Sequence, residues 1–391
     1  MAIKMNRKIF ENAKIYDTAS RSFREGKLTV EDGIIVMNDS ISGQDAEHID
    51  LGGAYVIPGM VDVHTHGRGG FESTEVDAGD MIKMARTYAK AGTTSFFPTM
   101  MSVPFDRLEA GIDASAGAMK MQAGGMDGAR VIGVHLEGRY LNVKKKGAHN
   151  PEYLKPLDPD ELSGLVKRFA SQGGKRFHLT CAPELDNGEN FVKRAVNEGV
   201  TVSIGHSNAT AEECEKALGW GVTGFTHLYN AMSAMSHREP GCVGVGLASD
   251  AYCELICDGR HIDPVVVKAT YRAKGSDKLV LITDSAPSAG LPEGRYTMGG
   301  AEIMVGNGAA YLLDGTLTGS IIDLYTGMRN LAKFAGIPIE DAIPCATINP
   351  ARMVGADDEV GSLGFGRRAD FIVADENYDI KQVYVGGKAA G

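Results

Sequence analysis

Apolar stretches alternate with amphipathic stretches through most of this chain. From residue 58 onward, runs of apolar and β-branched residues recur, and segments with helical spacing lie between them. This alternation is typical of a parallel β-sheet covered by helices. The strands that we predict cover residues 60–66, 93–100, 131–137, 177–182, 200–206, 224–228, 253–257 and 279–284. Eight strand–helix units favour a closed (β/α)8 barrel of the TIM type, so the predicted fold class is α/β.

The segments between the strands carry helix signals. We predict helices over residues 77–91, 159–172, 210–218, 263–273 and 321–335. Asp263 and Pro264 open one of these segments as an N-cap and a first-turn proline. Between Gly294 and Ser320 the sequence is rich in glycine and strand-like, and we predict a hairpin inserted after the eighth strand.

The two ends of the chain have a different pattern. Short strands over 8–15, 27–30, 33–37 and 54–57 are separated by turn signals such as Glu31-Asp32-Gly33, and similar strands return at 370–374 and 382–385. We predict that residues 1–57 and 356–391 together form a small β-sandwich domain. The barrel is then residues 58–355, inserted between the two halves of that domain.

Charge and cysteine content narrow the function classes. The formal charge of −10 and the pI near 5.5 argue against a nucleic-acid or anionic-membrane surface, because both partners require a basic field. We find neither an apolar run of membrane-spanning length nor a signal-peptide pattern in residues 1–10. The six cysteines are scattered without a CxxC pair, which favours neither a zinc ribbon nor a disulfide scaffold. We therefore predict a cytoplasmic protein that binds neither nucleic acid nor membranes.

The candidate chemistry lies at the ends of the predicted strands. His64 and His66 are two residues apart on the first strand, so both imidazoles can face one point. Further residues of this kind end later strands: Glu137, His206, His227 and Asp284. Because catalytic groups of (β/α)8 barrels sit at the carboxyl ends of the strands, we expect all six side chains to meet there.

Imidazole nitrogens and carboxylate oxygens form the ligand set of Zn²⁺ or Fe²⁺, and both metals stay open. We predict one metal held by Glu137, His206 and His227. A second metal site would combine His64, His66 and Asp284 and be bridged to the first through Glu137. Asp284 is also placed to act as the general base that takes a proton from the attacking water, or as a simple helix N-cap.

Several motifs carry a resemblance to a known family. Residues 58–67, PGMVDVHTHG, resemble the first-strand motif of the amidohydrolase superfamily. Later motifs resemble the N-acetylglucosamine-6-phosphate deacetylase family within it: HLEG at 135–138, KGAHNP at 146–151, GHSNAT at 205–210, THLYNAM at 226–232, REPG at 238–241, DGRH at 258–261 and TD at 283–284. The match runs in order over essentially the whole chain.

The resemblance implies removal of acetate from an N-acetylated amino-sugar 6-phosphate by a metal-dependent homodimer. It implies one or two divalent metals per subunit, with Glu137, His206 and His227 as ligands and Asp284 as the catalytic aspartate. The substrate-binding positions that it implies are Ala148, His149, Asn230, Ala231, Arg238, His261, Leu317, Thr318 and Gly319. From the residues alone, Arg238 is better explained as a surface partner of Glu239, and the three lysines 144–146 as a solvated loop.

Three alternatives stay open. A galactosamine-6-phosphate epimer is the nearest rival substrate, because no residue decides the orientation of the hydroxyl. A different amidohydrolase, such as a cyclic-amide hydrolase or an amino-acid deacylase, is the second alternative. Many cyclic-amide hydrolases carry a carboxylated lysine at the end of strand four, and residues 177–184 hold no lysine. A non-catalytic sugar-phosphate-binding protein would be expected to lack the ligands or the base.

Two positions depart from the family pattern. Arg139 stands where the family usually has proline, and Arg260 stands where a neutral residue is more common. We predict that Arg139 places a cation close to the metal site and alters which sugar or substituent is preferred.

Overall fold

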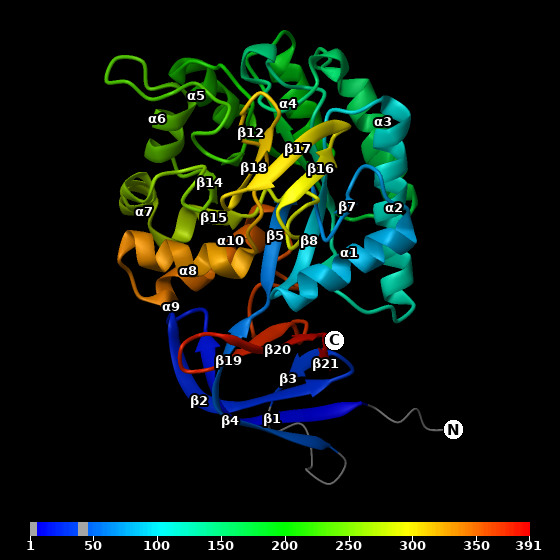
Figure 1. The fold of residues 1–391 in the computed structure, drawn as a ribbon, viewed down its shortest axis with the longest axis vertical. Helices are drawn as coiled ribbons and strands as arrows, with labels where there is room; N and C mark the ends of the chain where they lie inside the picture. The colour runs from blue at the N-terminus through cyan, green and yellow to red at the C-terminus, as the bar shows by residue number, and fades with distance from the viewer. Residues whose placement is uncertain (1–5, 38–45) are drawn as a thin grey trace.

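The computed structural model describes residues 6–37 and 46–391. Positions 1–5 and 38–45 of the predicted small domain lie outside the described residues. Figure 1 shows two parts, a barrel ringed by helices and a small β domain beneath it in which the first and last strands of the chain lie together. The boundary at residues 57 and 58 stays a proposal, and the strand that ends at Pro58 leads directly into the barrel.

The barrel is a run of parallel strands in sequence order. In the described part of the chain these are β5 Met60–Thr65, β8 Thr93–Met100, β10 Val134–Glu137, β11 Phe177–Cys181, β12 Thr201–Ile204, β13 Gly224–Phe225, β14 Tyr252–Ile256 and β15 Leu279–Ile282, with β9 Arg130–Val131 paired to β8. The first and last strands close the ring just beyond the end of β15, where the Asp284 amide donates to the His64 carbonyl at 2.9 Å. The predicted barrel class is therefore confirmed.

Three of the predicted strands, 200–206, 224–228 and 279–284, end two or three residues earlier than the sequence pattern indicated. His206, His227 and Asp284 lie two residues beyond the last residues of β12, β13 and β15. Their φ angles are +47°, +30° and +45°, a region that non-glycine residues rarely occupy and that costs about 1–3 kcal/mol each. An extended strand would carry each side chain on past the rim, whereas this bend turns it over the barrel mouth.

Helices surround the strands of the barrel. In the described part of the chain they are α1 Ala78–Lys90, α2 Phe105–Ala123, α3 Pro159–Ser171, α4 Gly188–Asn197, α5 Ala211–Trp220, α6 Gly241–Ala248, α7 Pro264–Lys278, α8 Leu324–Ala335, α9 Ile339–Ala346 and α10 Ile348–Met353. All five predicted helices are present, shifted by a few residues at their ends. Side chains cap the N-termini of five of these helices: Asp77 caps α1, Asp158 caps α3, Thr210 caps α5, Asp263 caps α7 and Asp323 caps α8. Over the described ranges, no helix is both long and apolar enough to cross a bilayer.

The insertion after the last barrel strand forms a small antiparallel sheet. It contains β16 Gly294–Met298, β17 Ala301–Gly306 and β18 Ala309–Leu312, so it has one strand more than the predicted hairpin. Figure 1 shows it in yellow across the front of the barrel. Glu72, on the two-residue strand β7 Phe71–Glu72, accepts a hydrogen bond from the Gly299 amide at 2.8 Å and ties this insertion to the loop after β5.

The small domain is one continuous sheet. Its order is β21 Lys388–Ala389, β20 Ile380–Val385, β19 Phe371–Ala374, β4 Glu47–Pro58, β1 Arg7–Asp17, β2 Ser22–Glu31 and β3 Ile34–Val36. The predicted turn at Asp32-Gly33 joins β2 to β3, and both residues have positive φ, as a type I′ hairpin requires. The Ile35 amide of β3 donates to the carbonyl of Arg367, in the segment before β19, at 2.8 Å, and buried apolar residues of β1, β2, β3, β4 and β19 form one cluster.

Candidate active site

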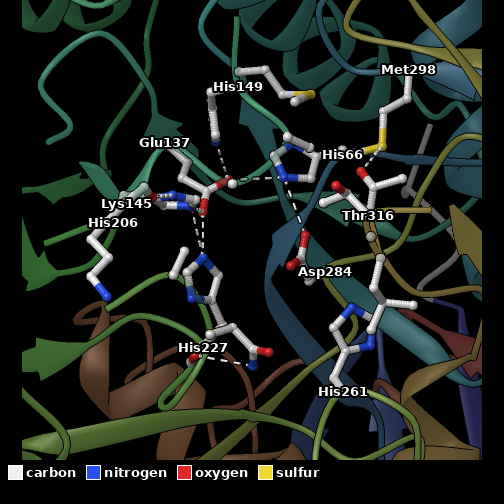
Figure 2. A pocket seen from close by; sticks show the side chains of 18 of the residues that line it. His66, Glu137, Lys145, His149, His206, His227, His261, Asp284, Met298 and Thr316 are labelled. Atoms are coloured by element: carbon white, nitrogen blue, oxygen red, sulfur yellow. Dashed lines mark hydrogen bonds and ion pairs between the residues drawn. The ribbon is translucent and has the colours of Figure 1, made fainter. Parts of the chain in front are cut away.

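A cavity of about 400 Å³ lies at the carboxyl ends of the barrel strands. Its wall includes most of the side chains that the sequence singled out, and Figure 2 shows them pointing toward one another. The predicted residues in the wall are His66, Glu137, Ala148, His149, His206, His227, Asn230, Ala231, His261, Asp284, Leu317, Thr318 and Gly319. His64 lies beneath the wall with none of its surface exposed, yet it faces the same carboxylates.

Glu137 stands at the centre and divides the histidines into two groups. Its Oε1 lies 3.0 Å from His206 Nε2 and 2.8 Å from His227 Nε2. Its Oε2 lies 3.2 Å from His64 Nε2 and 2.9 Å from His66 Nε2. Among the described residues, each histidine pair together with Glu137 meets the geometry of a metal-ligand set.

The hydrogen bonds on the far side of the His206 and His66 rings show which form of the imidazole each contact requires. His206 Nδ1 lies 2.8 Å from the Lys145 carbonyl, and His66 Nδ1 lies 3.3 Å from the Thr99 carbonyl. A carbonyl oxygen only accepts, so Nδ1 carries the proton and Nε2 of the neutral ring is a lone pair. These lone pairs point at carboxylate oxygens, and His206 Nε2 also lies 3.0 Å from His227 Nε2. Acceptors facing acceptors at this distance fit a shared cation, so the residues fit a divalent metal.

The electrostatics of the metal-free site agree with this. Burial alone would lower the pKa of His66, but the carboxylates of Asp284 and Glu137 overcome it and raise the pKa to about 9. Burial likewise opposes the charge on Glu137, yet the surrounding imidazoles hold its pKa well below the usual range. Without a metal, the anions therefore draw protons onto the histidines, in the place that a cation would take.

Asp284 lies beside the His64 and His66 pair. Its Oδ1 is 3.2 Å from His66 Nε2 and 3.6 Å from His64 Nε2. Burial would raise its pKa, but these two imidazoles lower it to about 2, so the carboxylate is ionised at neutral pH. The N-cap interpretation is wrong, because α8, the next helix along the chain, is capped by Asp323.

His149 also reaches the Glu137 carboxylate, with its Nε2 3.6 Å from Oε2. The Ser102 amide donates to His149 Nδ1 at 3.3 Å, so the proton of the neutral ring is on Nε2, toward the cavity. Burial, which outweighs the attraction of Glu137, lowers the pKa of His149 to about 4. His149 is therefore a neutral hydrogen-bond donor in the cavity wall.

The predicted phosphate contacts divide. Asn230, Ala231 and His261 line the cavity, whereas Arg238 is exposed and lies outside the wall formed by the described residues. Lys144 and Lys145, which the sequence favoured as a solvated loop, also line the cavity, and Lys144 is exposed. They bring positive charge to a cavity that the sequence alone did not assign to them.

Arg139 does not reach the metal-ligand groups, so the prediction of a cation beside the metal is wrong. Its guanidinium forms a paired hydrogen bond with the Glu161 carboxylate at 2.8 and 3.0 Å. It also lies over the ring of Phe105, 4.9 Å from the centroid. Its φ of +67° turns the side chain toward α3. Arg260 is exposed beside Gly308, in the turn between β17 and β18.

Glu254 is a further residue at the site that the sequence did not reveal. It lies on β14 with none of its surface exposed and accepts from His64 Nδ1 at 3.1 Å. Burial would raise its pKa, but His178 and His64 lower it to about 2. A single carboxylate inside an otherwise apolar strand, residues 253–257, was the available signal, because an ionised group is buried only when it has partners.

A parallel barrel with histidine and carboxylate groups set for metal at its carboxyl end defines a class of metal-dependent hydrolases. The amidohydrolase family profile matches residues 55–390, and the chain belongs to this family. This family membership and the ligand geometry support metal dependence, and they leave the identity of the metal open.

Individual relatives are similar over nearly the whole chain. N-acetylglucosamine-6-phosphate deacetylase of Vibrio furnissii is 32% identical over 92% of this chain and 88% of its own length. N-acetylgalactosamine-6-phosphate deacetylase of Escherichia coli O157:H7 is 34% identical over 93% of this chain and 94% of its own length. The crystal structure of N-acetylglucosamine-6-phosphate deacetylase from Pasteurella multocida superposes with a TM-score of 0.89 at 28% identity, over 98% of this chain and 99% of that one.

Proposed function

We propose that this protein hydrolyses the acetamide of N-acetylglucosamine 6-phosphate and releases glucosamine 6-phosphate and acetate. The observation that carries the proposal is the meeting of Glu137, His206 and His227 with Asp284 in one cavity. The chain is similar over almost its full length to proteins named as deacetylases, and this similarity supports the same reaction here.

The roles of the residues follow from their chemistry. Glu137, His206 and His227 would hold a divalent metal, which supplies activation of water and polarisation of the acetamide carbonyl when bound. Asp284, ionised and mostly buried, would take a proton from the attacking water and deliver it to the leaving amine nitrogen. His149 would donate a hydrogen bond from Nε2–H to the carbonyl oxygen as negative charge develops there.

The sugar phosphate requires donors elsewhere in the cavity. His261 donates Nδ1–H to the Asp258 carboxylate at 2.7 Å, which leaves its Nε2 free to face a ligand. Asn230, Ala231, Lys144 and Lys145 line the same cavity. On a chain with a net charge of −10, this local gathering of donors is what an anionic substrate needs.

The galactosamine epimer is the second candidate, because the E. coli relative named for it is as similar as those named for the glucosamine compound. The test is a deacetylation assay on both N-acetylhexosamine 6-phosphates and on both unphosphorylated sugars, with metal analysis of the same sample. We expect the glucosamine 6-phosphate compound to have the highest kcat/KM. Equal turnover of unphosphorylated sugar would contradict the phosphate site, and turnover of neither phosphate would contradict the reaction.

We further propose that the enzyme uses zinc or iron and acts as a cytoplasmic homodimer. All six cysteines are buried and free, which is compatible with a reducing compartment. The exposed position of Arg238, outside its own cavity wall among the described residues, supports a contribution to a neighbouring subunit. Sedimentation of the purified protein tests this, and an active monomer would contradict it.

A further inference from the structure

The buried carboxylate of Glu254 accepts hydrogen bonds from a residue of each metal-ligand group. Glu254 Oε2 accepts from His64 Nδ1 at 3.1 Å and from the backbone amide of His227 at 3.3 Å. His64 is a member of one group and His227 a member of the other. One carboxylate oxygen on β14 therefore contacts a ligand residue from each side of Glu137.

The contact with His64 fixes the form of its ring. A carboxylate only accepts hydrogen bonds, so His64 Nδ1 carries a proton, and in the neutral ring, the form that binds a metal, Nε2 is the lone pair. That lone pair lies 3.2 Å from Glu137 Oε2, in the direction a shared metal requires. Within the described residues His64 Nε2 has no hydrogen-bond partner, which is the condition expected of a nitrogen reserved for a metal.

The contact with His227 fixes a strained backbone. His227 has a φ of +30°, and its amide would be buried without a partner if Glu254 were absent. A buried donor left without a partner is destabilising. Glu254 thus supports the bend that turns His227 toward Glu137.

A purely structural pairing with His178 does not account for Glu254. His178 Nε2 lies 3.6 Å from Glu254 Oε1, and neither atom has a hydrogen-bond partner within the described ranges. His178 Nδ1 instead contacts the Thr201 hydroxyl at 2.8 Å. The close contacts of Glu254 are therefore those to His64 and His227.

We propose that Glu254 is a positioning residue that makes the group of His64, His66 and Glu137 competent to hold a second metal. It does so by holding His64 with Nδ1 protonated and Nε2 free. The inference rests on the metal assignment of the proposed function and extends it to a side chain that touches neither metal nor substrate.

The experiment compares Glu254→Met with Glu254→Gln. Met is similar in length and removes the acceptor, whereas Gln keeps an oxygen that can accept both hydrogen bonds. Metal-free proteins are loaded with Zn²⁺ and freed of excess, and zinc per subunit is measured by elemental analysis. We expect two ions in the wild type, and a second ion bound about 10–100-fold more weakly in Glu254→Met. Glu254→Gln should recover most of this affinity.

Reference variants identify which ion is lost. Glu254→Met should resemble His64→Gln and differ from His206→Gln, and the double variant His64→Gln with Glu254→Met should lose no more zinc than His64→Gln alone. His178→Gln, which changes the other neighbour of Glu254, should keep two ions. Circular dichroism of the metal-free variants controls for folding.

Spectroscopy of the wild type tests the same point without relying on a variant that must fold. In zinc-loaded protein, the nitrogen NMR shifts of labelled histidines should show a proton on His64 Nδ1. A proton on His64 Nε2, two tightly held ions in Glu254→Met, or a single ion in the wild type would each overturn the inference. Deacetylation is measured in parallel: the expected zinc pattern without turnover rejects only the proposed function, and turnover with an unchanged zinc pattern rejects only this inference.

Discussion

The two histidine groups on either side of Glu137 are built from different parts of the barrel. His206 and His227 lie beyond their strand ends on bent backbone, and His206 is anchored by the main-chain carbonyl of Lys145. His64 lies within β5, is fully buried, and is anchored by the side chain of Glu254. The contrast is between one histidine of each group: the Nδ1 partner of His206 is a main-chain carbonyl, whereas that of His64 is a buried carboxylate.

This difference determines which histidine loses its Nδ1 hydrogen-bond partner when a neighbouring side chain is replaced. A main-chain carbonyl is present whatever residue occupies position 145, so the anchor of His206 survives changes of side chain. The anchor of His64 disappears with one substitution at position 254. We therefore expect the group of His206 and His227 to be the indispensable one and the group of His64 and His66 to be adjustable.

The largest effect is expected from His206→Gln. Loss of the metal at this group removes both water activation and carbonyl polarisation, which together contribute several kcal/mol. We expect kcat/KM for the N-acetylhexosamine 6-phosphate to fall by about 10⁴-fold or more. Steady-state assays with metal analysis check this. Near-normal turnover in His206→Gln would reverse the assignment of the indispensable group.

Asp284→Asn should follow in size. General acid–base catalysis contributes about 10²–10⁴-fold, so kcat should fall by that factor while zinc per subunit stays near the wild-type value. Asn preserves the shape of the side chain but cannot take the proton. Unchanged turnover would contradict the assignment of the base, and loss of metal in step with activity would make Asp284 a ligand instead.

Changing both His64 and His66 to Gln sharpens the comparison directly. We expect zinc per subunit to fall by about half, because the substitutions remove metal ligands from one group only. We expect turnover to fall by less than about tenfold. Parallel measurement of zinc and kcat decides it. Complete loss of turnover would show that both metals are required.

The pH dependence of stability should separate metal-free from metal-loaded protein. The pKa of His66 is raised from 6.5 to about 9 in the metal-free fold, so its contribution to stability is full below pH 6.5 and is lost as pH rises through 9. The Tm of metal-free protein should therefore fall over this range, and less so in His66→Gln. Zinc-saturated protein should not follow this fall, because protons compete with the metal for the ligands. Calorimetry across pH 6–9.5 tests both curves, and identical curves would contradict the prediction.

The smallest effect on the reaction is expected from Arg139→Ala. The Arg139 side chain faces Glu161 rather than the cavity, so the ratio of kcat/KM for the two epimers should stay within about twofold of the wild type. Loss of its charge-assisted hydrogen bonds should lower the free energy of unfolding by about 1.5–3 kcal/mol. Denaturant unfolding and the epimer assay give the two values, and a changed epimer ratio would restore a role in specificity.

Much of the fold could be predicted because its signals are local. The apolar runs and helical patterns between residues 60 and 284 predict the eight strands, and the N-cap at Asp263 marks where one helix begins. The sequence also grouped Glu137 with His206 and His227, because strand ends of a barrel must meet at one rim. These inferences need only spacing and chain order.

The direction of individual side chains could not be predicted. Arg139 was expected near the metal, but its positive φ and the carboxylate of Glu161, 22 residues later, turn it away. The role of Glu254 depends on contacts with His64 and His227, which lie 190 and 27 residues away along the chain. Local sequence patterns do not indicate contacts between residues so far apart in the chain.

The sequence by itself determined the barrel, its helices and the set of residues able to bind metal, since these depend on periodicity and on residue chemistry. Only the tertiary structure decided that Glu137 presents one oxygen to each histidine pair, that Lys145 and Glu254 anchor the rings, and that Arg238 lies outside its own cavity wall as the described residues form it. The physical reason is that ring orientation, proton position and burial are set by neighbours across the barrel, and these neighbours exist only when the ring of strands has closed.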